Sequence, residues 1–238
     1  MAIMPFLAMT AAEIAKKEAL PEKLAWMACH FSPYGLGLSN LPRTLPPGSL
    51  LMVDDITPIR GHDFRIILDQ LAERTEALNC SGILLDFQRP GSEETAALVA
   101  VLTQDLPCPV AVSHLYAGAG SFPVFLPPVP LSVPPEDHLA PWQGREIWLE
   151  LALDGEEIIV TAEGAAFTHL PYPSPSEMGF RDEALCCHYR CIQEEDSVKF
   201  LLWRTEEDLE KLMKKAEDSG ITSAVGLYQE FSKSISCR

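Results

Sequence analysis

The sequence has few basic residues and lacks the common signatures of nucleotide or metal chemistry. Its 18 Lys and Arg stand against 34 Asp and Glu, which gives a formal net charge of -16. Phosphate backbones and anionic lipid surfaces would repel such a chain. The charge balance therefore predicts no nucleic-acid and no membrane partner. No G-x-G-x-x-G, Walker, H-E-x-x-H or G-x-S-x-G pattern occurs. Nucleotide binding, zinc proteolysis and nucleophile-elbow hydrolysis therefore have no support.

The seven cysteines are odd in number and irregularly spaced, which is not the pattern of a disulfide framework and indicates a reducing compartment. Cys187 and Cys191 have a spacing that zinc sites use, but no second pair accompanies them. We therefore expect small thiols in a strand, no metal site and no cofactor. No apolar run reaches the roughly 18 residues that span a bilayer, and the N-terminus lacks a signal peptide's basic segment. These features predict a cytoplasmic protein.

Short apolar segments alternate with helical patterns in the first half of the chain. Strands are expected at Leu24–Phe31, 49–55, Gly82–Phe87, 109–114 and 123–126. Near-continuous apolar runs of this length suit parallel strands that are covered on both faces. Helical spacing is seen at 62–79, and at 92–102 behind the N-cap residue Ser92. A further helix is expected at about 10–19, where Thr10 and Glu13 have capping-box spacing.

The second half departs from this alternation. Two β-hairpins are expected, one at about 146–161 around Asp154-Gly155 and one at about 184–203. A helix should follow at 205–219, and a last strand at 221–228. Eight candidate core strands result, near residues 26, 52, 84, 111, 125, 150, 201 and 225.

These patterns predict an α/β fold. We interpret it as a depleted (β/α)8 TIM-like barrel in which some helices are missing and β-hairpins are inserted in the second half. Residues 1–238 are expected to form it as a single domain, because barrels of this type use about 250 residues.

Two segments resemble the chitinase-like proteins of glycoside hydrolase family 18. The family pattern Asp-Gly-x-Asp-x-Asp-x-Glu lies over 81–88, where Gly82 and Asp86 match and Ser81, Leu84 and Gln88 do not. The segment 200–228 looks like the family's closing strand–helix–strand unit, with Tyr228 where a tryptophan is common. Together the two segments cover about a quarter of the chain, and both imply the barrel fold.

The resemblance implies that the hydrolytic acid is missing. In that family the final Glu of the motif donates the proton, and here Gln88 stands in its place. An amide has no proton to give near neutral pH, and general acid catalysis contributes roughly 10²–10⁴-fold. A non-catalytic or catalytically altered barrel that binds a carbohydrate or glycan fragment is therefore the leading hypothesis.

Functional groups in barrels collect at the C-terminal ends of the strands. The candidate catalytic residues there are Asp54, Asp55 and Asp86, which end neighbouring strands and could share acid–base work. The alternative is a purely structural role, in which each carboxylate caps a turn or pairs with Arg60 or Arg89. The candidate ligand-binding residues are Gln88, Arg89, His30, His114, Tyr116, Tyr228 and Glu230. Phe87 should point outward into the helix layer, because alternate residues of a strand face opposite ways.

Two other functions remain open at this stage. An active, glycosidase-like hydrolase would use Asp54, Asp55 and Asp86 around its substrate or a metal. A structural or protein-interaction role would use the hairpins, and the apolar Ile147-Trp148-Leu149 segment would then pack on the barrel or on a second subunit. The sequence leaves the oligomeric state undetermined, with a homodimer as one option.

Overall fold

The computed structural model describes residues 4–153, 155–170, 179–216 and 219–235. The chain divides into two units, which we call the barrel unit and the sheet unit. Of the described residues, the barrel unit comprises 4–127, 145–150 and 222–235, and the sheet unit comprises 128–144, 151–153, 155–170, 179–216 and 219–221.

Eight parallel strands close the barrel. In spatial order they are β1 (Phe6–Met9), β14 (Ile221–Leu227), β8 (Ile147–Leu151), β7 (Val124–Leu126), β6 (Val110–Ser113), β5 (Gly82–Asp86), β4 (Leu50–Asp54) and β2 (Leu24–Phe31). The ring closes because β1 pairs with β14 on one side and with β2 on the other. A short strand, β3 (Leu38–Ser39), pairs antiparallel with the end of β2. The predicted TIM-like barrel is therefore confirmed.

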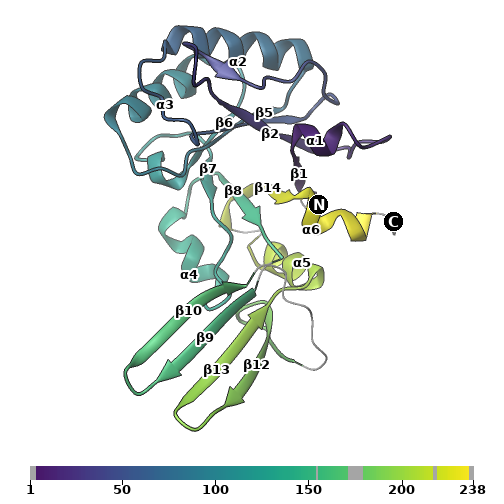
Figure 1. Cartoon of the computed structure of the whole chain (residues 1–238), viewed down its shortest axis with the longest axis vertical. Helices are drawn as coiled ribbons and strands as arrows, with labels where there is room; N and C mark the ends of the chain where they lie inside the picture. The colour runs from purple at the N-terminus through teal and green to yellow at the C-terminus, as the bar shows by residue number, and fades with distance from the viewer. Residues whose placement is uncertain (1–3, 154, 171–178, 217–218, 236–238) are drawn as a thin grey trace. The chain divides into compact units, whose positions relative to one another are not determined.

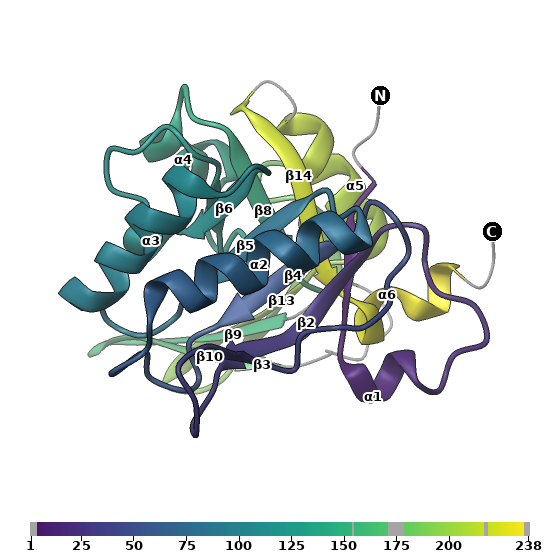
Figure 2. The same ribbon diagram turned by 90° about the horizontal axis from the view of Figure 1, so that it is seen from above.

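Helices cover only part of the barrel. Figure 2 shows α2 (Phe64–Leu78) and α3 (Glu93–Asp105) lying over the outer faces of neighbouring strands. Asp63 caps α2, and Ser92 caps α3 by accepting from the Thr95 N–H at 3.0 Å. Shorter helices are α1 (Ala11–Ile14) and α6 (Tyr228–Ile235), with a 3-10 turn at His114–Tyr116. No helix in the part of the chain that the structure describes is both long and apolar enough to span a bilayer.

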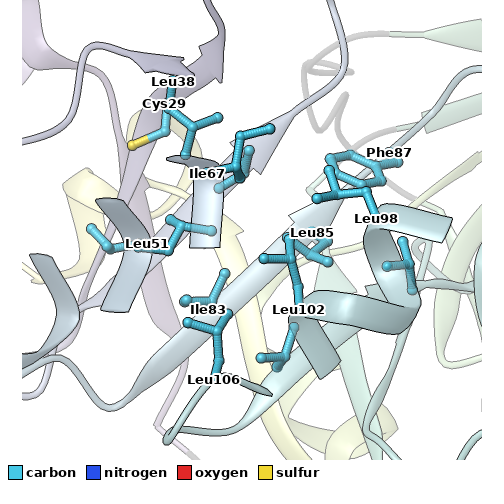
Figure 3. Packing of buried hydrophobic residues seen from close by; sticks show 14 of the residues in the cluster. Cys29, Leu38, Leu51, Ile67, Ile83, Leu85, Phe87, Leu98, Leu102 and Leu106 are labelled. Atoms are coloured by element: carbon cyan, nitrogen blue, oxygen red, sulfur yellow. The ribbon is translucent and has the colours of Figure 1, made fainter. Parts of the chain in front are cut away.

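Side chains of the barrel strands alternate between two apolar clusters. Leu84 of β5 and Met52 of β4 lie in the inner cluster, and Ile83, Leu85 and Phe87 lie in the outer one. The outer cluster includes the buried leucines and isoleucine of α2 and α3, as Figure 3 shows for Ile67, Leu98 and Leu102. Phe87 is fully buried among them, as predicted. The same alternation places Asp86 on the inner face.

The sheet unit holds a five-stranded antiparallel sheet (Figure 1). Its order is β10 (Gly164–Leu170), β9 (Gly155–Thr161), β13 (Ser197–Trp203), β12 (Cys187–Gln193) and β11 (Phe180–Asp182). Two helices belong to this unit, α4 (Pro135–Leu139) and α5 (Glu206–Lys215). The predicted hairpin at 184–203 is confirmed as β12–β13, and α5 begins at the predicted capping box of Thr205 and Asp208.

The hairpin predicted at 146–161 is wrong. β8 pairs in parallel with β7 inside the barrel, whereas β9 pairs antiparallel with β10 and β13 in the other sheet. The Asp154-Gly155 dipeptide favours a tight turn from its local sequence alone, which does not decide which strands pair. Asp154 itself lies outside the described residues. The apolar Ile147–Leu149 segment is buried because β8 belongs to the barrel.

Three further expectations need correction. The eighth barrel strand is β1 and not the segment near residue 201, which forms β13 of the sheet unit. The segment 200–228 therefore contributes only its last strand, β14, to the barrel. The helix expected at 10–19 is the single turn α1, although its predicted capping box between Thr10 and Glu13 forms.

Candidate functional site

Three polar side chains lie next to one another at the C-terminal ends of adjacent barrel strands. Strand register places His30 of β2 beside Asp54 of β4, and Asp54 beside Asp86 of β5. All three face inward, since their strand neighbours Phe31, Val53 and Leu85 belong to the outer cluster. A bulge between Met27 and Cys29 keeps His30 on that inner face.

Both carboxyl groups have raised pKa values. Burial raises the pKa of Asp86 most, the hydrogen bond from Gln88 lowers it, and the charges of Asp54 and Asp55 raise it further. Burial likewise raises the pKa of Asp54, against the lowering effects of the Ile56 N–H and of His30. Adjacent inward carboxyls in a half-buried position disfavour double ionisation, so one of them holds a proton more readily than an exposed aspartate does.

Gln88 completes this group, which we call the strand-end cluster: His30, Asp54, Asp86 and Gln88. The Gln88 side-chain amide donates to Asp86 Oδ1. Gln88 is exposed, and it lies two residues beyond Asp86 in the chain. The cluster thus offers an amide, carboxyl oxygens and an imidazole, all of which can hydrogen-bond to hydroxyl or amide groups of a ligand.

Asp55 has a different environment. It is buried on the outer face, where Oδ1 accepts the Gln88 N–H at 2.9 Å and Oδ2 accepts the Arg89 N–H at 3.0 Å. The Arg89 guanidinium donates to the Ile56 carbonyl, and it pairs with no carboxylate among the described residues. Both residues therefore fix the loop after β5 to the loop after β4, and neither joins the strand-end cluster.

The other predicted ligand-binding residues are more scattered. Tyr116 donates to the carbonyls of Arg89 and Pro90 and packs edge-on against Phe87, so it supports the same loop. His114 is half-buried and begins the 3-10 turn after β6. Tyr228 begins α6 with the Lys17 ammonium 4.9 Å from its ring centroid, and half-buried Glu230 lies in the first turn of that helix.

Sequence reasoning missed Ser113 as a site residue. Ser113 ends β6 on the inner face, two residues beyond Ala111 of the inner cluster. It is 1 % exposed, and its hydroxyl has no hydrogen-bond partner among the described residues. An unpaired buried hydroxyl costs free energy unless a ligand or water satisfies it. The signal in the sequence was a serine ending an otherwise apolar strand.

The barrel was compared with known protein families and solved structures. The sequence matches no family model and no curated protein. Among solved structures, the chain has the fold of the family 18 chitinase barrels. A GH18 chitinase from Cycas revoluta in complex with (GlcNAc)3 superposes with a TM-score of 0.61 at 11% identity, over 97% of this chain and 96% of that one.

Two bacterial structures share the same fold. A chitinase from Chromobacterium violaceum gives a TM-score of 0.58 at 10% identity, over 94% of this chain and 93% of that one. The spore cortex-lytic enzyme SleL of Bacillus cereus gives 0.58 at 11% identity, over 94% of this chain and 70% of that one. At these identities the likeness establishes the fold alone.

Asp86→Asn should stabilise the protein at neutral pH. A carboxyl whose pKa is raised by folding ionises at a cost to the folded state, and burial raises the pKa of Asp86. The cost is absent below about pH 4, where unfolded Asp is protonated, and it grows as the pH rises toward the raised pKa. Urea denaturation at acid and neutral pH should show the gain only at neutral pH.

Asp55→Asn is the matched control for that measurement. It makes the same chemical change one strand away, but it weakens two hydrogen bonds from the Gln88 and Arg89 N–H groups. We expect this variant to be less stable than the parent at neutral pH. Equal effects of the two substitutions would show that Asp86 carries no ionisation cost.

Proposed function

We propose that this chain binds a glycan fragment at the C-terminal end of its barrel without the acid catalysis of the chitinases. The observation that carries the proposal is the pairing of Gln88 with Asp86. The residue two positions beyond Asp86 is an amide that already donates to the carboxylate, so it can orient a ligand but cannot protonate a leaving group.

The shared fold supports the choice of ligand. The Cycas revoluta chitinase is described with (GlcNAc)3 and with (GlcNAc)4 in two structures, and SleL is described as a cortex-lytic enzyme. N-acetylated oligosaccharides and peptidoglycan fragments are therefore the ligands to test. Ser113 and the strand-end cluster supply hydrogen-bond donors and acceptors for the hydroxyl and acetamido groups of such ligands. The raised pKa of Asp86 favours its protonated carboxyl, which can also donate.

A second candidate function rests on the two neighbouring inward carboxyls. Asp54 and Asp86 are register partners on strands roughly 4.8 Å apart, and the pKa of each is raised. A protonated member could serve as a general acid while its partner stays ionised, as in hydrolases that use two carboxylates. In this version the protein is a glycosidase-like hydrolase that works without a Glu at position 88.

Titration calorimetry with (GlcNAc)3, (GlcNAc)4 and peptidoglycan fragments tests the proposal. We expect binding by the parent protein, a loss of at least tenfold in Asp86→Ala, and no change in Asp105→Ala, which removes an exposed carboxylate at the end of α3. The absence of heat for every ligand at millimolar concentration would overturn the proposal, as would an unaffected Asp86→Ala variant.

Product analysis in the same samples separates the two candidate functions. The parent should release no shorter sugars, and Gln88→Glu should keep the fold while adding at most trace hydrolysis, since Leu84 fills another acidic position of the family pattern. Turnover by the parent that disappears in Asp86→Asn would establish the hydrolase instead.

A further inference from the structure

β10 forms one edge of the five-stranded sheet. All seven of its residues pair with β9, and no strand among the described residues pairs with its other side. In an antiparallel sheet alternate N–H and C=O groups of an edge strand point outward, where they can pair with another chain. Figure 1 shows β10 at the outer margin of this sheet.

The two edges of the sheet differ in composition. The opposite edge, β11, has three residues, two of which are the charged Arg181 and Asp182. β10 has the sequence GAAFTHL, with no Lys, Arg, Asp, Glu or Pro, and its first six residues are exposed. Short length, charge and proline are the features that normally prevent edge pairing, and β10 has none of them.

An apolar row ends at this edge. Phe167 of β10 lies opposite Ile158 of β9. On the other side of β9, Ile158 lies opposite Phe200 of β13, and Phe200 in turn lies opposite Cys191 of β12. Ile158 and Phe200 are partly buried, whereas Phe167 is 61% exposed. In the part of the chain that the structure describes, the row therefore stops at a large aromatic side chain, and a further strand would cover that ring.

We propose that a second copy of this chain pairs with β10 through its own β10, antiparallel about a two-fold axis at Ala166. In this register Ala165 of one copy faces Phe167 of the other, so each ring meets a small side chain. Continuing further along the strands, Glu163 faces His169, so a carboxylate that accepts hydrogen bonds meets an imidazole whose ring N–H can donate.

The contact is expected to be weak. One strand pair of seven residues spans roughly 24 Å and buries less area than a standard protein interface. The net charge of -16 on each copy also opposes association. We therefore expect association only at high protein concentration, and the dimer joins the two sheets into one of ten strands.

Sedimentation velocity from low micromolar to several hundred micromolar protein tests the dimer. The parent should shift from monomer to dimer, and Phe167→Lys should need at least tenfold more protein to do so. Phe180→Lys is the matched control, because Phe180 is also an exposed Phe, at 69%, but lies on the opposite edge. A monomer at all concentrations overturns the proposal, and so does equal loss in both variants.

Cysteine cross-linking tests the register. In a Cys191→Ser background, Ala166→Cys should form an intermolecular disulfide with oxidised glutathione, because residue 166 faces itself across the axis. Thr168→Cys should not, because its copies lie about 14 Å apart along the strands. Equal cross-linking of the two variants, or none by Ala166→Cys in a sample that sediments as a dimer, overturns the assigned pairing.

Discussion

Replacing Arg204 by methionine should lower the free energy of unfolding by about 3–5 kcal/mol, because four carbonyl acceptors, two of them buried, lose their donor. Arg204 is 5 % exposed and follows β13. Its Nε donates to the Cys186 carbonyl at 3.1 Å, and its terminal nitrogens donate to those of Val129, Pro130 and Leu185. One guanidinium thus joins the 128–144 segment to the turn before β12.

Methionine retains the apolar stem of the side chain, so the loss reports mainly on the hydrogen bonds. Urea denaturation followed by circular dichroism measures the change. Arg190→Met is the matched control, since Arg190 is exposed on β12, and we expect a change within about 0.5 kcal/mol there. Similar losses in the two variants would mean that the carbonyls bound by Arg204 are satisfied without it.

Asp208→Asn should destabilise the protein by about 2–4 kcal/mol at neutral pH. The Asp208 side chain is fully buried, and it accepts from Arg181 at 3.0 Å, from His188 Nδ1 at 2.8 Å, and from the backbone and hydroxyl of Thr205. An Asn side chain presents one acceptor and one donor to this set of donors, so at least one of them loses its partner.

The same variant should show a defined pH dependence. Burial raises the pKa of Asp208, but the hydrogen bonds from Thr205 and His188 outweigh it, and the net pKa lies below the ordinary value. A lowered folded-state pKa stabilises the fold above the unfolded value near 4, and this stability is lost as the pH falls through the folded pKa. The difference between parent and variant should therefore shrink below about pH 4.

Glu207→Gln is the control for charge alone. Glu207 also binds Arg181, at 3.1 Å, but it is exposed, and solvent screens such a pair. Its pKa is lowered by Lys211 and Arg181, but because the pair is exposed we expect little change in stability and a much smaller change in the acid limb of the pH profile than Asp208→Asn gives. A variant of Asp208 that lost stability equally at acid and neutral pH would indicate a packing defect instead of a lost carboxylate.

Local patterns in the sequence were sufficient for the elements that lie in the first half of the barrel. The strands β4, β5 and β6 were visible as apolar runs, the helices between them as helical spacing, and the cap of α3 as Ser92. The outward position of Phe87 followed from the period of two along a strand. These features depend only on residues that are close to one another in the sequence, so they can be predicted from it.

The partners of β1, β8 and β13 depended on contacts between distant residues. β1 has only four residues, and it is a barrel strand because it lies between β14 and β2. The Asp154-Gly155 signal favoured a hairpin, but burial of Ile147–Leu149 among the barrel strands is the larger gain in apolar contact. β13 had the same apolar character as a barrel strand and pairs instead with β9 and β12.

The site divides in the same way. The sequence alone determined that carboxylates end the neighbouring strands β4 and β5, and that an amide stands at position 88. The tertiary structure decided that Asp54 joins Asp86 on the inner face while Asp55 binds the loop backbone on the outer face. Asp54 and Asp55 are adjacent in the chain, so the register of β4 decides which of them faces inward. That register is set by the apolar clusters on either side of the barrel wall. These clusters form only when distant segments of the chain pack together.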